Sequence, residues 1–566
     1  SITSIFSFRP LLVLVSVTVM TQCSLPEQEH ALSEVAPTRH FGTGEGEPIS
    51  SRTNSSLKIL FLSSDTGGGH RASAESLAVQ FQRLFPGTTY DLLDIWSEAS
   101  CSWPYHTIKD TYAKYSASPW KWRTLYYATD NALYAKFYNA HSCYMNEAKI
   151  MEKMEKYNPD VVVSVHPCMN YLPLSATRKI STKLQRYIPF FTVVTDFGSG
   201  HVTWFNKEVD KLYLASEQLK GIAQKRAGVP DEKIGLSGLP IRYEFAVQAD
   251  AMGDRTSERG RVYRAKIREQ LNIGANERMI LVMGGGEGVG SLSDIVNELY
   301  VKLHARKIDA IICVICGRNE KLKDDLETRC WDTVVSRSLR PYMVQRAFDQ
   351  AALKTANLQP YLIQRALNRV APKSAKGDDA VDAPLNIDVI PLGFVEQMAE
   401  FMVAADVLVT KAGPGTIAEA AAVGLPVMVT SYLPGQEAGN VDIVSNGGFG
   451  GFLVDPGAIG QEIAMWLKYP RLLDKMSQNA RKVGHPHAAE EIALDIGKMS
   501  LERMDRNELR ASQNAPLSEH QTKEANHLSE ISAPNHGPHD CTSISKRERS
   551  FFFQFNAFRQ PKYHIV

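Results

Sequence analysis

A glycine-rich turn between a predicted strand and a predicted helix constrains this chain more than any other feature. Residues 404–409 are mostly apolar, as expected of a buried parallel strand, and the turn KAGPGT separates them from a helix-forming stretch at 417–423. Unpaired N–H groups and the positive end of a helix dipole together form an anion site. Gly413 and Gly415 let the backbone approach an anion, because no Cβ intervenes. The glycines alone are equally compatible with an ordinary βα turn.

Side chains beyond this turn could extend such a site. Glu419 lies about one helical turn after Gly415, on a face that can reach past phosphates towards a ribose. Gln436 and Glu437 follow the next predicted strand, at 427–430, in a loop where hydrogen-bonding groups would suit a sugar.

The whole stretch 410–444 resembles the nucleotide-sugar-binding segment of glycosyltransferase family 28, and within it the plant-type monogalactosyldiacylglycerol synthases. The resemblance implies UDP-galactose as the donor substrate and no prosthetic group. It implies contacts with the diphosphate and ribose by Gly413, Gly415, Thr416 and Glu419, and contacts with the sugar by Gln436 and Glu437. Lys411, Pro414 and Asn440 complete the donor-binding residues expected in this segment.

A second strand–turn–helix unit lies near the start of the globular part. Residues 58–63 predict a buried strand, which leads into DTGGGH and an amphipathic helix at 71–84. GGGH is not the dinucleotide-binding fingerprint. His70 would project into the cleft above the strand ends, although a lone histidine more often caps or packs. The string SSDTGGGHRASAE is similar to a motif of the galactolipid synthases, which implies that His70 is the catalytic base and Gly69 a donor contact.

Three further loops follow predicted strands in the second half. The turn GGGEG after residues 279–283 would be a flexible turn by itself, but it resembles the family's loop at the donor phosphates and the reacting sugar. The loop after 386–390 resembles the family's loop over the uracil, where backbone groups read the base. Further donor contacts are therefore expected from Gly284, Gly285, Gly286, Glu287, Gly288, Arg318, Phe394 and Val395.

Residues 96–144 combine many tryptophans and tyrosines with interleaved Lys and Arg. The net charge of the chain is +1, which argues against nucleic acid as a partner. The composition fits either a membrane interface or an aromatic helical subdomain packed on itself. The family resemblance implies docking on a membrane and admission of the acceptor, diacylglycerol. Trp103 and Pro104 look like a site linked to activation by an anionic lipid, phosphatidylglycerol.

Two more predicted strands, 158–165 and 190–195, end in His166 and Asp196. The resemblance implies that such residues, with His201 and Trp204, lie beside the acceptor cleft. The loop FGSG, between Asp196 and His201, differs in sequence from the corresponding loop of the plant enzymes, which leaves the conformation of this loop open. Asp196 and His201 could hold zinc, but no third ligand has suitable spacing, and no metal is expected. Cys313 and Cys316 lie in an apolar strand without a second CxxC, which favours core cysteines.

Two runs of alternating strands and helices predict two doubly wound α/β domains facing a cleft. Together with the resemblance, which covers about residues 57–330 and 385–500, this pattern predicts the GT-B fold. The expected domains are a targeting or disordered segment at 1–56, an acceptor domain at 57–245 with its membrane-facing region at 96–144, an interdomain connection at 246–275, a UDP-sugar-binding domain at 276–500 with an insertion at about 328–384, and a disordered tail at 505–566.

The apolar run at 11–20 is too short to span a bilayer comfortably and fits a signal-peptide core. An N-terminal signal or transit segment is therefore one expectation. The resemblance implies a peripheral protein of the plastid (chloroplast) envelope membrane. A homodimer is one oligomeric state that the sequence permits.

The expected reaction is transfer of galactose to the sn-3 hydroxyl of 1,2-diacylglycerol, with inversion to a β-galactoside. A base must take the hydroxyl proton, and the helix N-terminus at 413–416 could stabilise the UDP leaving group without a metal. Alternatives are a lipid glycosyltransferase using UDP-glucose or UDP-N-acetylglucosamine, a UDP-sugar epimerase, and an inactive lipid-binding scaffold.

Overall fold

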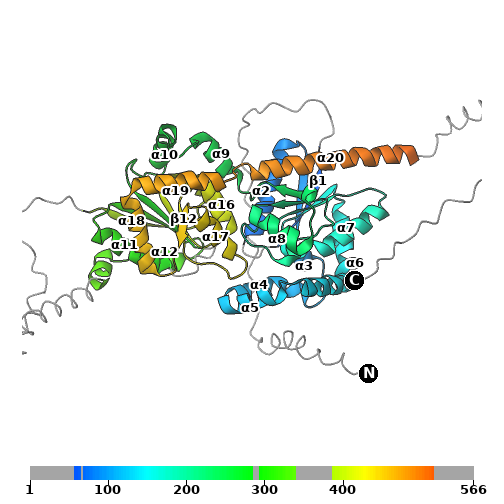
Figure 1. Ribbon diagram of the computed structural model, residues 1–566, viewed down its shortest axis with the longest axis horizontal. Coiled ribbons are helices and arrows are strands. Elements are labelled where there is room, and N and C mark those ends of the chain that lie inside the picture. Colours follow the sequence, from blue (N-terminus) through cyan, green and yellow to red (C-terminus); the bar gives the residue numbers. More distant parts are fainter. Residues whose placement is uncertain (1–55, 65–67, 285–291, 339–384, 515–566) are drawn as a thin grey trace, which may run out of the picture. The chain divides into compact units, whose positions relative to one another are not determined.

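Two parallel β-sheets flanked by helices form the framework of the chain (Figure 1). The computed structural model describes residues 56–64, 68–284, 292–338 and 385–514, all within one unit that spans residues 54–566. The predictions for residues 1–55, for most of the insertion and for the tail from 515 onward lie outside the described residues.

The first sheet has six strands in the order β2-β1-β3-β4-β5-β6, and every neighbouring pair is parallel. Strands buried on both faces need uninterrupted apolar sequence, and VVVS and FFTV are buried throughout. The strand order reverses between β1 and β3, so the crevice at their carboxyl ends is the expected ligand position in this sheet. The strands are β1 (Lys58–Leu62), β2 (Thr89–Leu93), β3 (Val161–Ser164), β4 (Phe190–Val193), β5 (Lys211–Leu214) and β6 (Ile234–Leu236).

The second sheet also has six parallel strands, in the order β12-β11-β10-β7-β8-β9. Its order reverses between β7 and β10, which is where Gly284 and the turn at 411–413 follow the strands. The strands are β7 (Met279–Met283), β8 (Ala310–Ile315), β9 (Ile387–Leu392), β10 (Val407–Thr410), β11 (Val427–Val429) and β12 (Gly450–Phe452).

The helices of the first half include the aromatic region, which folds as α4, α5 and the start of α6. They are α2 (Gly69–Leu84), α3 (Ile95–Glu98), η1 (Tyr105–Thr107), α4 (Ile108–Ser116), α5 (Pro119–Thr129), α6 (Ala132–Tyr157), η2 (Pro167–Met169), α7 (Tyr171–Lys183), η3 (Val202–Trp204), α8 (Glu217–Ala227) and η4 (Asp231–Lys233).

Helices α9 and α10 occupy the predicted connection, and the remaining helices follow it. They are α9 (Tyr243–Met252), α10 (Glu258–Gln270), α11 (Leu292–Ala305), α12 (Glu320–Glu327), α15 (Met398–Ala404), α16 (Pro414–Ala422), α17 (Ala438–Asn446), α18 (Pro456–Lys468), α19 (Pro470–Val483) and α20 (Ala488–Asn514).

Arginines attach the predicted connection to the second sheet. Arg255 is 3% exposed and donates to the backbone carbonyls of Met402 and Val403 near the end of α15, and to the Ala405 carbonyl. Those carbonyls have no intrahelical partner and carry the negative end of the helix dipole. A guanidinium supplies them with hydrogen-bond donors and with a positive charge. Arg264 and α10 are held in the same way, through the Asp406 carboxylate.

The predicted strands agree with the structure in place and direction, whereas two of the three shortest strands, β6 and β12, were not predicted. Each has only three residues, and β12 reads GGF, which carries no apolar run. The two doubly wound sheets confirm the predicted α/β fold class.

The last described helix corrects the predicted end of the second domain. α20 runs to Asn514, although we expected a disordered tail from residue 505. It packs against α2 and shares a buried cluster with residues of the first sheet, including Phe61. The carboxylate Oδ2 of Asp495 accepts from Lys211 Nζ and Tyr213 Oη, both at 2.7 Å. Residues 489–504 of α20 therefore pack into the core of the first half.

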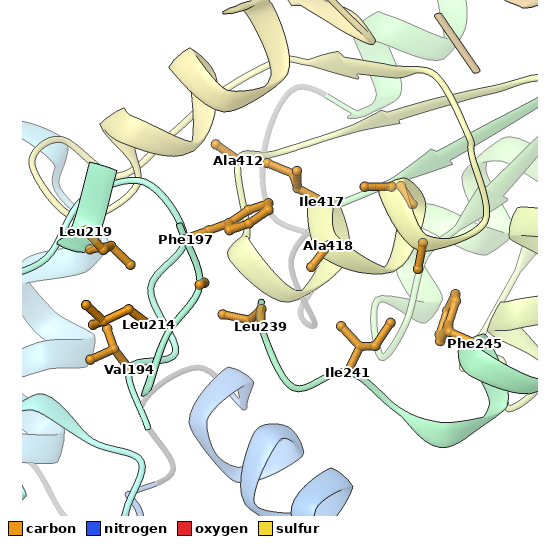
Figure 2. Close-up of a cluster of buried hydrophobic side chains, with 14 of the residues drawn as sticks. Val194, Phe197, Leu214, Leu219, Leu239, Ile241, Phe245, Ala412, Ile417 and Ala418 are labelled. Atoms are coloured by element: carbon orange, nitrogen blue, oxygen red, sulfur yellow. The ribbon is translucent and has the colours of Figure 1, made fainter. Parts of the chain in front are cut away.

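A buried apolar cluster joins loops of the first half to α16 (Figure 2). Phe197, from the loop after β4, lies next to Ala412 and Ile417 of the glycine-rich turn and its helix. Leu239 and Ile241, from the segment after β6, lie close to Ala418. Burial of these side chains holds the predicted phosphate-binding helix against segments of the first half.

Replacement of Ile492 tests the assignment of α20 to the first core. Ile492 is fully buried with Phe61 and Phe81, so Ile492→Ala should lower the free energy of unfolding by about 2–4 kcal/mol. Val262→Ala is the control, because Val262 is 61% exposed on α10 and should change stability by less than about 0.5 kcal/mol. Equal midpoints in denaturant for both variants would contradict the assignment.

Candidate active site

His70 lies at the start of α2, where the chain leaves the first glycine loop. Gly68, the N-cap of α2 and two residues before His70, has φ 80°, a left-handed conformation that glycine adopts without steric cost. The His70 side chain is 8% exposed, and its Nδ1 lies 2.6 Å from Oγ1 of Thr195. The backbone therefore turns sharply enough to place the imidazole over the end of β4.

Three predicted acceptor residues gather around His70 at the carboxyl ends of β3 and β4. The ring centroids of His70 and His166 are 4.8 Å apart, and those of His70 and Trp204 are 5.9 Å apart. Trp204 donates through Nε1 to Oδ2 of Asp196 at 2.5 Å. His166, Asp196 and Trp204 are all at least 95% buried, so the switch point of the first sheet carries a polar cluster with little access to water.

Burial sets the protonation of this cluster. It lowers the pKa of His70 to about 4, with the Val165 carbonyl acting in the opposite direction. It lowers the pKa of His166 well below 6.5, and the nearby His70 adds to that effect. It raises the pKa of Asp196 to about 7, although the Trp204 hydrogen bond favours the carboxylate. Both imidazoles are therefore neutral near pH 7, and His70 is available to accept a proton.

His201 lies apart from this cluster and contacts the aromatic helices. Its Nε2 is 3.2 Å from Thr129 Oγ1, its Nδ1 is 2.9 Å from Thr203 Oγ1, and its ring is 5.1 Å from that of Tyr126. With both nitrogens engaged, and with Asp196 bonded to Trp204, the zinc alternative for this pair is disfavoured. No cluster of three metal-ligating side chains occurs among the described residues.

The second candidate region is the turn between β10 and α16. Gly413 is the N-cap of α16, and Pro414 follows as its first residue, where its missing N–H costs nothing. A Cβ placed on Gly415 would have no heavy atom of the described residues within 4 Å. Lys411 Nζ instead pairs with Oε1 of Glu437 at 3.1 Å. The helix N-terminus is accordingly accessible to a phosphate-sized anion.

Glu419 forms a bidentate ion pair that the sequence did not predict. Its carboxylate accepts from Nε and Nη2 of Arg242 at 2.7 and 2.9 Å. Burial raises the pKa of Glu419, and Arg242 opposes that shift. Each carboxylate oxygen keeps a second lone-pair site, so a ribose hydroxyl could still donate to it.

The loop at 436–440 combines structural residues with one unsatisfied side chain. The Asn440 amide is 1% exposed, accepts from Gly198 N at 2.9 Å and donates to the Ala412 carbonyl at 2.8 Å. Asn440 therefore links two backbone segments, and its predicted contact with the donor stays a prediction. Gln436 Oε1 is buried and has no hydrogen-bond partner among the described residues, so it is available to a ligand hydroxyl.

The remaining predicted donor residues lie at one edge of the second sheet. Gly284 follows β7, Arg318 follows β8 and is exposed, and Phe394 and Val395 follow β9, with Phe394 77% exposed. Because β7, β8 and β9 are parallel neighbours, these residues share the carboxyl edge with the α16 turn. Gly285, Gly286, Glu287 and Gly288 lie outside the described residues.

Comparison with known proteins decides the family. Residues 70–241 match the model for monogalactosyldiacylglycerol (MGDG) synthase, and residues 279–440 match the C-terminal domain of glycosyltransferase family 28. The chain is 31% identical over 473 residues to monogalactosyldiacylglycerol synthase 1, chloroplastic, of Arabidopsis thaliana, covering 81% of this chain and 75% of that protein. The chain belongs to the MGDG synthase family.

A second plant relative agrees with this assignment. A probable MGDG synthase, chloroplastic, of Nicotiana tabacum is 33% identical over 454 residues, covering 79% of this chain and 71% of that one. A crystal structure of MurG from Acinetobacter baumannii matches at a TM-score of 0.42 and 16% identity, covering 78% of this chain and 99% of that one. The family and the two doubly wound sheets together confirm the expectation of a GT-B glycosyltransferase.

The sequence missed several residues of this MGDG synthase-family site. Thr195 and Arg242 were overlooked, although Thr195 directly precedes Asp196 at a strand end and could have been found from that position. Gly198 was noted only as part of an unusual loop. A Cβ on Gly198 would lie 2.1 Å from the Gly439 carbonyl oxygen, so a glycine is required at this contact.

Some aromatic side chains of residues 96–144 are buried, and others are exposed to solvent. Tyr105 and Tyr126 are buried, and a Cβ on Gly435 would lie 2.4 Å from the Tyr126 ring. Large apolar and aromatic side chains that remain exposed here are Trp103, Trp120, Tyr127, Leu133, Phe137 and Tyr144. Pro104 is also exposed. Within the described ranges, no helix is long and apolar enough to cross a bilayer.

Proposed function

We propose that this MGDG synthase-family chain transfers galactose from UDP-galactose to the sn-3 hydroxyl of 1,2-diacylglycerol, with inversion at the anomeric carbon. The observation that carries the proposal is the neutral, buried His70 imidazole at the switch point of the first sheet. The names of the relatives support the substrates, and the described geometry supports the division of roles between the two halves.

His70 is proposed to act as the general base. It takes the proton from the acceptor hydroxyl while that oxygen forms a bond to the anomeric carbon and the bond to UDP breaks. Because the hydroxyl attacks opposite the leaving group, the α-linked sugar becomes a β-galactoside. His166, Asp196 and Trp204 border the same space and would contact the glycerol end of the acceptor.

The turn and helix at 413–416 are proposed to hold the diphosphate. An accessible helix N-terminus stabilises the negative charge that develops on UDP as it leaves. Glu419 would accept from the ribose, and the unsatisfied Gln436 Oε1 would accept from a sugar hydroxyl. Phe394 and Val395 at the same sheet edge would cover the uracil.

The exposed side chains of α4, α5 and the start of α6 are proposed to dock on a membrane. Aromatic side chains favour the bilayer interface, and Lys109, Lys114, Lys121 and Arg123 would attract anionic lipid. Trp103 and Pro104 are exposed beside these helices and remain the proposed contact for phosphatidylglycerol. The plastid envelope is the proposed location, because the named relatives are chloroplastic. A homodimer remains a prediction.

Replacement of His70 tests the base. His70→Ala should lower turnover at least about a hundredfold, the usual scale for loss of a general base, while UDP affinity stays near that of the parent protein. His304→Ala, at the exposed end of α11, is the matched control and should keep full turnover. The assay follows labelled galactose from UDP-galactose into diacylglycerol vesicles, with UDP-glucose and UDP-N-acetylglucosamine run beside it. Near-normal turnover of a folded His70→Ala protein would exclude this role.

Replacement of Glu419 tests the ribose contact. Glu419→Ala should weaken UDP binding by about 1.5–3 kcal/mol, the cost of losing a charged hydrogen bond. It should also lower the thermal midpoint, because Arg242 loses its partner. Glu75→Ala, which removes an exposed ion pair with Arg71, controls for the loss of a carboxylate. A lower thermal midpoint with unchanged UDP affinity in calorimetry would leave Glu419 with a structural role alone.

Replacement of exposed aromatics tests the membrane contact. The triple change of Trp120, Tyr127 and Phe137 to serine should reduce binding to anionic vesicles at least tenfold and leave UDP affinity intact. All three are more than 50% exposed, so the fold should tolerate the change. Tyr469→Ser, 55% exposed in the second half, is the control. Binding of the parent protein should rise with anionic lipid and fall with salt. Unchanged co-sedimentation of the triple variant would place the contact elsewhere.

A further inference from the structure

Two oxygen atoms, a hydroxyl and a backbone carbonyl, interact with the His70 imidazole. Thr195 Oγ1 lies 2.6 Å from Nδ1, and the Val165 carbonyl also hydrogen bonds to the His70 side chain. The same Thr195 hydroxyl donates to the Val165 carbonyl at 3.4 Å. Thr195 is 3% exposed and Val165 is fully buried, so water does not compete for these bonds.

Counting hydrogens at this junction fixes which ring nitrogen of His70 carries the proton. A carbonyl oxygen only accepts, and a hydroxyl has a single hydrogen, which we assign to the Val165 carbonyl because Thr195 Oγ1 lies 3.4 Å from that acceptor. The hydroxyl oxygen and the carbonyl therefore both require a donor from the ring. With the hydroxyl hydrogen assigned in this way, Nδ1 carries the ring hydrogen and the lone pair lies on Nε2.

His166 is held in the opposite tautomer. Its Nδ1 accepts from the backbone N–H of Cys168 at 3.3 Å, so its hydrogen lies on Nε2. The two adjacent imidazoles thus differ in chemistry although both are neutral. Of the two, only His70 has an unprotonated Nε2.

We propose that Thr195 is a positioning residue that holds His70 in the Nδ1–H tautomer, with Nε2 as the proton acceptor for the sugar-transfer reaction. The inference rests on the proposed role of His70 as base. When Nε2 takes the acceptor proton, Nδ1–H stays bonded to Thr195 and Val165, and the ring does not rotate. The proton on Nε2 passes to solvent after the glycolipid leaves.

The partners of Nδ1 are uncharged, unlike the carboxylate that orients the histidine in the serine-protease triad. A hydroxyl and a carbonyl fix the orientation of the ring without strongly stabilising its charged form. The effect of losing Thr195 should therefore be smaller than the effect of losing His70, because the Val165 carbonyl remains.

Thr195→Val removes the hydroxyl at nearly constant volume and is the main test. We expect kcat to fall about 10- to 100-fold, with the KM for UDP-galactose and the Kd for UDP unchanged. Thr195→Ser restores a hydroxyl and should recover kcat to within about threefold of the parent. Thr192→Val is the matched control, because Thr192 lies on β4, is fully buried and donates its hydroxyl to Asn170. Its kcat should stay within about twofold of the parent.

A double-mutant cycle separates positioning from a general structural effect. In the His70→Ala protein, Thr195→Val should cause no further loss of kcat, because the base that it positions is absent. An equal loss in both backgrounds, or a Thr195→Val protein with kcat within twofold of the parent, would overturn the inference. If Thr195→Val no longer binds UDP, Thr195→Ala takes its place in the cycle. Normal turnover of His70→Ala itself would instead overturn the base assignment, so the two failures are distinguishable.

Discussion

The ion pair between Arg242 and Glu419 fixes how the glycine-rich turn is presented. Arg242 directly precedes α9, and Glu419 lies in the middle of α16, so the pair joins the segment after β6 to the helix behind the turn. A guanidinium and a carboxylate meeting through two parallel bonds define orientation as well as distance. The Glu419 side chain is 11% exposed and that of Arg242 is 40% exposed, so loss of Arg242 would leave a carboxylate with little access to water. The apolar cluster around Leu239, Ile241 and Ile417 supplies the burial that strengthens this pair (Figure 2).

A second junction depends on close approach of two backbones. Gly198 and Gly439 come so near that a Cβ on either would meet the other's backbone within 2.3 Å. Asn440 bonds to Gly198 and to Ala412, so one side chain ties the loop after β4 to the glycine-rich turn. The loop after β4 also contains Thr195 and Asp196, which lie just before Gly198. Residues proposed for the acceptor and for the sugar are thereby held in one hydrogen-bonded network.

Sequence reasoning predicted those parts of the molecule that local chemistry determines. Buried parallel strands require apolar runs, and phosphate-type turns require glycine, so most strands and both candidate turns were found at their positions. The pairing of Arg242 with Glu419 spans 177 residues, and no local pattern encodes it. The packing of α20 against the first half was not predicted either, because it too depends on contacts that are distant in the sequence. Its apolar positions show that one face is buried, but they do not show which sheet covers it. The two backbone bonds of Asn440 were not predicted, because an asparagine in a loop looks the same in the sequence whether it binds backbone or sugar.

The two candidate regions differ in electrostatics in the way that the proposed substrates require. Around His70, burial governs every resolved shift: it keeps His70 and His166 neutral and raises the pKa of Asp196 to about 7. A cluster with little charge suits diacylglycerol, which brings none and must be accommodated out of water. Around α16, the helix N-terminus supplies positive potential where a diphosphate brings negative charge. In the proposed reaction, the acceptor proton moves to an imidazole that is held by neutral partners. The negative charge develops on UDP, next to the N-terminus of α16. Separation of the two tasks lets the base remain unprotonated near neutral pH, since an adjacent fixed anion would raise the pKa of His70 and favour its inactive imidazolium form.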